Sequence, residues 1–159
     1  MDRNTDALEQ LYRDRYRTFR DVLAGVVGSH DLAREVVQEA FARALRERRQ
    51  FRGDGSLEAW VWRIALNVAF KLRRDLRREW DLDAEPPLRG GADHDADVRA
   101  AVQALPPRRR LMVFLRYYAD LSYAEIAEAL SISEGTVAAT LAQARAELGE
   151  RLELEEVRP

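Results

Sequence analysis

Residues 121–145 read LSYAEIAEALSISEGTVAATLAQAR, and no other stretch indicates its local structure so clearly. Ser122 and, three residues later, Glu125 form a capping-box pattern, which predicts the start of a helix. The polar turn Ser131-Ile132-Ser133 separates this helix from a second one, for which Ser133 is the predicted N-cap. Two short helices joined by such a turn are typical of a helix-turn-helix, whose second helix enters a DNA groove.

The second helix of this motif carries few groups that could contact DNA. Its outward positions are Ala138, Ala139, Thr140, Ala142 and Gln143, and Arg145 is the only cation between 134 and 145. Each phosphate contact that is missing weakens binding and lowers its salt dependence. Alanine also forms helices well and offers a smooth packing surface. Two hypotheses therefore stay open: the helix reads DNA weakly, or it contacts a protein instead.

The composition excludes several classes of protein. The 159 residues include no cysteine and only two histidines, far apart, so we expect no metal site and no cofactor. No apolar run approaches the roughly 20 residues of a membrane span, and the N-terminus lacks a signal-peptide core. We therefore expect a cytoplasmic protein without membrane insertion. Nucleophile–base pairs, phosphate-cradling glycine motifs and paired carboxylates in apolar surroundings are absent from the sequence, which argues against an enzyme.

The charged residues are segregated along the chain, although the net charge is only −2. Basic residues gather at 43–52, at 71–78 and at 108–110, and acidic residues at 79–97 and 147–156. Basic clusters of this kind suit contacts with phosphates, whereas the acidic segments do not.

Apolar periodicity predicts an all-α fold with two small domains. Apolar residues recur at three-to-four spacing in three helices of the N-terminal half, from Leu8 to Gly28, from Ser29 to about Leu45, and over 57–79. The segment 80–97, WDLDAEPPLRGGADHDAD, is acidic and has no period, as expected of a flexible linker. A short helix over 98–105 and another after Pro106-Pro107 precede the helix-turn-helix. The predicted domains are 4–79 and 98–152, and the way in which they pack stays open.

Three motifs occur in a diagnostic order. They are Val36–Phe41 (VVQEAF), then 51–56 (FRGDGS) followed by Ala59-Trp60 and 63–67 (RIALN), and then 121–127 with 132–137 of the helix-turn-helix. Together they resemble the extracytoplasmic-function (ECF) sigma factors of bacteria, the smallest class of promoter-specificity subunit of RNA polymerase. The resemblance covers about residues 6–152.

This resemblance implies three binding surfaces. One would dock on the clamp helices of the largest polymerase subunit, and its residues are Glu35, Gln38, Glu39 and Phe41. A second would bind and melt the −10 element, and its residues are Phe51, Arg52, Gly53, Asp54, Trp62, Arg63, Asn67, Lys71, Arg73, Arg74, Arg77 and Arg78. A third would read the −35 element beside the flap of the second-largest subunit, and its residues are Ser133, Glu134, Thr136, Thr140, Gln143 and Arg145.

Two questions remain open at the level of the sequence. Trp60 lies on the apolar stripe of the third helix and is predicted to be core, whereas Trp62 lies off it and suits either core or base stacking. The predicted function is a sigma subunit that binds core RNA polymerase and promoter DNA, with an atypical −35 contact. The alternative is a sigma-like protein that binds core polymerase or an anti-sigma factor without reading DNA.

Overall fold

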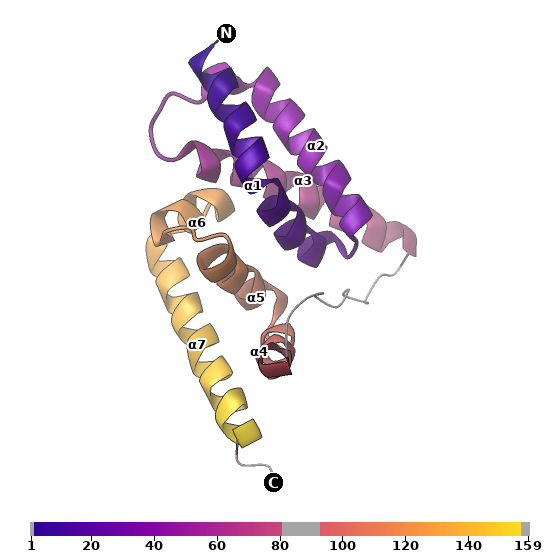
Figure 1. Cartoon of the computed structure of the whole chain (residues 1–159), viewed down its shortest axis with the longest axis vertical. Coiled ribbons are helices and arrows are strands. Elements are labelled where there is room, and N and C mark those ends of the chain that lie inside the picture. Colours follow the sequence, from indigo (N-terminus) through magenta and orange to yellow (C-terminus); the bar gives the residue numbers. More distant parts are fainter. Residues whose placement is uncertain (1, 81–92, 157–159) are drawn as a thin grey trace.

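The computed structural model describes residues 2–80 and 93–156, and this part of the chain is helical (Figure 1). The N-terminal unit consists of α1 (Arg3–Val27), α2 (His30–Arg46), the single 3-10 turn η1 (Arg48–Gln50) and α3 (Leu57–Trp80). The C-terminal unit consists of α4 (Asp93–Gln103), α5 (Pro107–Val113), the π-helical turn η2 (Phe114–Tyr118), α6 (Tyr123–Leu130) and α7 (Glu134–Glu156). The predicted all-α fold with two helical units is confirmed.

Three helix ends form where the sequence predicts them, at Ser122, Ser29 and Gly28. The Ser122 hydroxyl accepts the N–H of Glu125, and the Glu125 carboxylate accepts the N–H of Ser122, both at 3.1 Å. Ser29 caps α2 by accepting the N–H of Leu32, and Gly28 ends α1 with a φ of 90°. Such a left-handed conformation costs glycine little because it has no Cβ.

The predicted linker 80–97 overlaps the beginning of α4. Residues 81–92 lie outside the described residues, and from Asp93 the chain is already helical in α4, five residues before the predicted start at Val98. The stretch 93–97 therefore belongs to this helix and not to an irregular segment.

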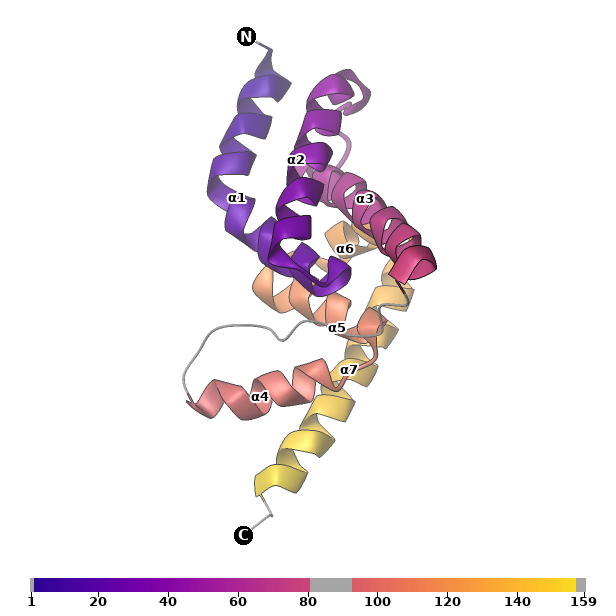
Figure 2. The ribbon, with the colours of Figure 1, turned by 90° about the vertical axis from the view of Figure 1, so that its right-hand side faces the viewer.

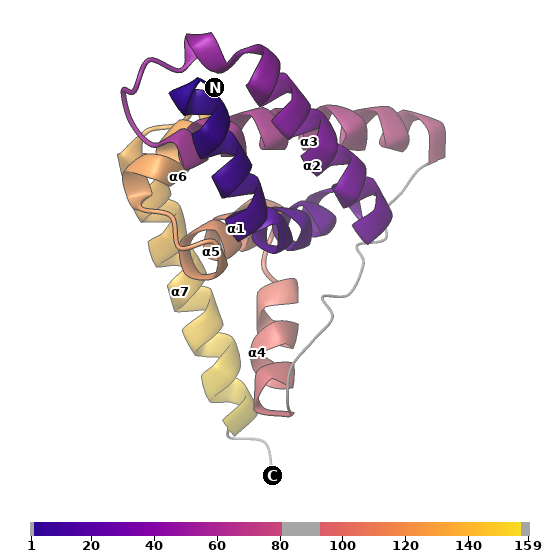
Figure 3. The same ribbon diagram turned by 45° about the horizontal axis from the view of Figure 1, so that its top comes forward.

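α3 is buried on almost every side in its first half. Between residues 59 and 69, only Arg63 and Asn67 are exposed. A helix that is apolar around its circumference needs neighbours on more than one side. Here α1 and α2 contact α3 within the N-terminal unit, and α6 contacts it from the C-terminal unit (Figures 2 and 3).

The two units pack against each other and share one apolar core, which the sequence left open. The core cluster includes Phe19 and Trp62 from the N-terminal unit and Leu115 and Ile126 from the C-terminal unit. α5 and η2 contact α1, while α7 runs from its start beside α6 away from the N-terminal unit (Figures 1 and 2).

Two polar contacts join η2 and Ala119, the residue that follows it, to α1. The Tyr118 hydroxyl donates to Asp21 Oδ2 at 2.6 Å, and Arg15 donates to the carbonyl of Ala119. The described structure is thus a closed arrangement of the two units.

Candidate polymerase and nucleic-acid interface

The outward face of α2 presents three of the four residues predicted to bind polymerase. Glu35, Gln38 and Glu39 are exposed, and the Glu39 carboxylate lies 3.8 Å from Arg43 and 3.3 Å from Arg46. A rigid helix with amide and carboxylate groups on one face can dock on a basic or amphipathic helix of a partner.

Phe41 is the exception on this face, and its predicted contact role is corrected. Its side chain is 5% exposed and meets the rings of Phe19 and Tyr12 edge-to-face, with centroids 5.3 and 5.1 Å apart. Phe41 therefore holds α2 against α1. Sequence reasoning missed two exposed apolar neighbours, Tyr12, which contacts Phe41, and Leu45, one helical turn further along α2. Both residues belong to the apolar stripes of their helices, and such a position predicts burial and not exposure.

The glycine-rich segment 51–56, here termed the −10 loop, immediately precedes α3 in the chain. Arg52, Gly53 and Asp54 are exposed, and Gly53 and Gly55 have φ values of 85° and 89°. Because glycine adopts this conformation readily, the loop can expose backbone N–H and C=O groups. Phe51 at its start is half-buried against Trp60.

A side chain of α1 holds the −10 loop in place, which the sequence did not predict. The Asn4 amide of α1 donates to the carbonyls of Arg48 and Phe51, at 3.0 and 3.5 Å. Nothing in the sequence pointed to Asn4, because its partners lie more than 40 residues away along the chain.

Four exposed side chains then follow one face of α3, here termed the polar stripe. They are Arg63, Asn67, Lys71 and Arg74, spaced by three or four residues. Cations in such a row can contact successive phosphates, and an amide can hydrogen-bond a base edge. Arg73 is half-buried, and the side chains of Arg77 and Arg78 lie outside the described residues.

Trp62 does not belong to this surface, so its prediction as a stacking platform is corrected. Its ring is 0% exposed and stacks on Phe19, with centroids 3.9 Å apart and planes 15° from parallel. The indole N–H donates to Glu58 Oε1 at 3.3 Å. Trp62 is core because α3 is covered on more than one side. Trp60 is 7% exposed, which confirms its prediction as core.

Helix α7, the second helix of the helix-turn-helix, begins with polar groups that bond to one another. Ser133 Oγ accepts the N–H of Thr136 at 3.1 Å and lies 2.8 Å from the Thr136 hydroxyl. Glu134 is exposed beside them, and Thr140 is half-buried one turn further on. Gln143 is exposed, and its carbonyl accepts from Arg109 at 3.2 Å.

Arg145 is held by two tyrosines that the sequence did not single out. Its Nη1 donates to the hydroxyls of Tyr117 and Tyr123, at 3.0 and 3.2 Å. These hydroxyls, that of Tyr117 foremost, raise the pKa of Arg145 further above its ordinary value. Arg116 lies 6.0 and 5.7 Å from the centroids of the same two rings. Arg145 therefore belongs to a cluster of two cations and two phenols, of which Arg145 and Tyr117 are exposed.

Two carboxylates of α6 lie at the end of the −10 loop. Glu125 hydrogen-bonds Ser56, and the Glu128 carboxylate stands 3.0 Å from the point that a Cβ on Gly55 would occupy. Partial burial would raise the pKa of Glu125, but the N–H of Ser122 and the hydroxyls of Ser56 and Ser122 lower it more. The closed arrangement therefore places negative charge from one unit against the loop of the other.

Residues 2–80 and 93–156 contain neither a candidate metal site nor a helix that could span a membrane. No group of three side chains among them could hold a metal ion. Their helices are also too short or too polar to cross a bilayer.

Comparison with known proteins defines the family. The model for Sigma-70 region 2 matches residues 11–79, and that for Sigma-70, region 4, matches residues 95–148. The ECF RNA polymerase sigma-E factor of Escherichia coli K12 is 33% identical over 131 residues, which cover 70% of this chain and 69% of that protein. The RNA polymerase sigma-H factor of Pseudomonas aeruginosa is 30% identical over 141 residues, covering 76% and 73%. The chain belongs to the ECF family of RNA polymerase sigma factors.

Solved structures share the fold over most of the chain. The sigma factor RpoE in complex with the anti-sigma factor NepR from Bartonella quintana superposes with a TM-score of 0.76, at 23% identity, over 91% of this chain and 96% of that one. CnrH in complex with the cytosolic domain of CnrY gives a TM-score of 0.69 at 24% identity, over 94% and 90%.

Proposed function

We propose that this chain is a promoter-specificity subunit that binds core RNA polymerase, opens the −10 region and contacts the −35 region weakly. The observation that supports this most directly is the −10 loop followed by the exposed polar stripe of α3, inside a region-2 match. In this proposal residues 4–79 bind polymerase and the −10 element, residues 98–152 bind the −35 element, and 80–97 connect them. Such a protein works by binding in the cytoplasm, with no covalent chemistry of its own.

Polymerase docking is assigned to the outward face of α2. Its exposed carboxylates and amide, at Glu35, Gln38 and Glu39, complement a basic or amphipathic partner helix, which we take to be the clamp helices of the largest subunit. Tyr12 and Leu45 add exposed apolar surface near this face. Glu35→Arg should then weaken binding to core polymerase, whereas Glu9→Arg, the same change of charge at an exposed position of α1, should not.

Strand opening is assigned to the −10 loop and the polar stripe. An unstacked base needs a pocket of backbone and side-chain polar groups, which the loop and the Asn67 amide can supply. Arg63, Lys71 and Arg74 can hold the phosphates of the same strand. Each phosphate bound on a single strand adds roughly 0.7 to the slope of log K against log salt.

The −35 contact is assigned to the first turns of α7. Ser133, Thr136 and the free N–H groups of this helix end can bind a phosphate. Glu134 opposes that contact, and Arg145 is the only cation between 134 and 145. With two or three basic groups fewer than a strong reader of duplex DNA, affinity should be lower by about two orders of magnitude.

A second function is favoured by the alanine-rich face of α7 and by the closed contact between α6 and the −10 loop. In this alternative the chain binds core polymerase or an anti-sigma factor and does not read promoter DNA. In that case a partner protein, and not a −35 element, would bind the alanine-rich face of α7.

Transcription in a purified system separates the two functions. The chain is added to core polymerase and to fragments that tile the source genome, and transcripts are mapped. A promoter-specificity subunit gives transcripts with defined start sites, whereas the alternative gives binding to core polymerase without initiation on any fragment. Asn67→Ala, at an exposed position, should reduce the transcripts while leaving polymerase binding unchanged.

A further inference from the structure

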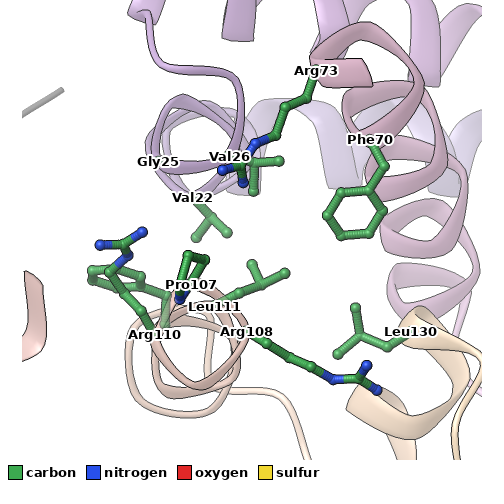
Figure 4. A pocket seen from close by; sticks show the side chains of 11 residues that line it. Val22, Gly25, Val26, Phe70, Arg73, Pro107, Arg108, Arg110, Leu111 and Leu130 are labelled. Atoms are coloured by element: carbon green, nitrogen blue, oxygen red, sulfur yellow. The ribbon is translucent and has the colours of Figure 1, made fainter. Parts of the chain in front are cut away.

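A cavity of about 320 Å³ lies between the two units (Figure 4). Apolar side chains form its walls, with Val22 and Val26 from α1, Phe70 from α3, Leu111 from α5 and Leu130 from α6. Its volume falls at the lower end of the roughly 300–1,000 Å³ of small-molecule sites, which are frequent between domains. Arg73, which the resemblance placed on the −10 surface, lines this cavity, whereas the residues assigned above to polymerase docking, strand opening and the −35 contact do not.

All charged residues that line this cavity are positive. They are Arg73 from α3 and Arg108 and Arg110 from α5 (Figure 4). Arg110 is only 8% exposed and donates to the carbonyl of Gln103 at 3.0 Å, so its charge is fixed in place beside the cavity. Arg108 is exposed at the rim. An apolar interior with a cationic rim complements a molecule that has a hydrocarbon chain and an anionic head.

We propose that this cavity binds an amphipathic carboxylate, with its hydrocarbon chain against Val22, Phe70 and Leu111 and its head group paired with Arg108. Each methylene that leaves water on binding should tighten the dissociation constant by roughly four-fold. The carboxylate should contribute roughly another ten-fold through its pairing with the guanidinium.

Occupation of the cavity would hold the two units together. Its walls come from α1 and α3 on one side and from α5 and α6 on the other, so the complete site exists only when the units are packed. A ligand that binds one arrangement and not the other shifts the equilibrium toward the first. The ligand would therefore stabilise the closed arrangement, a consequence that does not depend on the proposed role in transcription.

Binding is measured on the full chain alone by isothermal titration calorimetry with decanoate, below its micellar concentration. The cavity predicts saturable binding of one decanoate per chain. Decanol has the same chain without the charge and should bind roughly ten-fold more weakly, and acetate has the charge without the chain and should not bind. Absence of decanoate binding at millimolar concentration, or equal affinity for decanol, would overturn the proposal.

Two glycines of the chain supply a matched pair of variants. A Cβ on Gly25, which lines the cavity, meets nothing within 4 Å, so the ring in Gly25→Phe can enter the cavity. Gly149 in α7 also has open space at its Cβ and does not line the cavity. Gly25→Phe should abolish decanoate binding and Gly149→Phe should leave it unchanged. Binding that survives Gly25→Phe within two-fold would place the ligand elsewhere and refute the site.

A rim variant keeps the test decisive if Gly25→Phe does not fold. Arg108→Glu changes an exposed side chain and should weaken decanoate binding by at least ten-fold. Arg13→Glu makes the same change at an exposed position of α1 outside the cavity lining and should have no effect. Equal affinities for the two variants would contradict the proposed pairing. Because the titration contains neither polymerase nor DNA, its outcome is independent of the proposed function.

Discussion

Replacing Trp62 tests the assignment of this ring to the core. Trp62 is fully buried, stacks on Phe19 with centroids 3.9 Å apart and donates to Glu58. Truncating a buried tryptophan to alanine costs about 3–5 kcal/mol, through lost apolar burial and the cavity that remains. Since domains of this size are stable by only about 5–15 kcal/mol, Trp62→Ala should lose a large part of that stability.

A second substitution at position 62 separates the free energy contributed by the stacking from that of the hydrogen bond. Trp62→Phe keeps an aromatic ring against Phe19 and loses the bond to Glu58, which is partly exposed, so it should cost about 1–2 kcal/mol. Urea unfolding can be followed by the fluorescence of Trp60 and Trp80, which both variants retain. A cost below about 1 kcal/mol for Trp62→Ala, together with lost affinity for single-stranded −10 DNA, would refute the reasoning and restore the stacking role.

Three further predictions concern the interface and the recognition helix. Ala138→Arg with Thr140→Arg should raise the salt slope of −35 binding by about 0.9 for each phosphate reached, measured by fluorescence anisotropy, and an unchanged slope would exclude this face from DNA. Burial, and then the hydrogen bond to Asp21 and its charge, raise the pKa of Tyr118 to about 12 from 10.0. The stabilisation that Tyr118 gives is therefore complete below pH 10 and lost as the pH rises from 10 to 12, and Tyr118→Phe should flatten this part of the curve of melting temperature against pH. The pKa of Glu125 is lowered in the folded chain, so its contribution is present above pH 4.5 and is lost as the pH falls further. Glu125→Gln should remove that loss, and an acid transition identical in the two proteins would contradict the role assigned to this carboxylate.

The features that the sequence predicts correctly are those set by neighbours along the chain. The capping box of Ser122 and Glu125 and the termination of α1 at Gly28 depend on contacts within a few residues, and both occur as expected. The same holds for the helix-turn-helix itself, whose turn and caps lie within 15 residues of sequence. The candidate site on α3 follows from the same periodicity, since Arg63, Asn67 and Lys71 share the face that stays exposed.

The features that could not be predicted from the sequence depend on contacts between segments that are distant along the chain. Trp62 lies off the apolar stripe of its helix, and its burial depends on packing against Phe19, 43 residues earlier. The contacts of Arg145 with Tyr117 and Tyr123 likewise need the final placement of α7 beside η2 and α6. No local sequence pattern indicates the closed arrangement of the two units. The apolar side chains that form this contact lie at positions that the periodicity of each unit already accounts for.

Permanganate footprinting of promoter DNA tests strand opening by the N-terminal unit most directly. Core polymerase with this chain should make −10 thymines reactive on a fragment that yields transcripts. The double variant Lys71→Glu and Arg74→Glu, altered at exposed positions of the polar stripe, should bind polymerase normally and leave the thymines protected. Reactive thymines with that variant, or protected thymines with the natural chain bound to polymerase on every fragment, would contradict the assignment of DNA melting to α3.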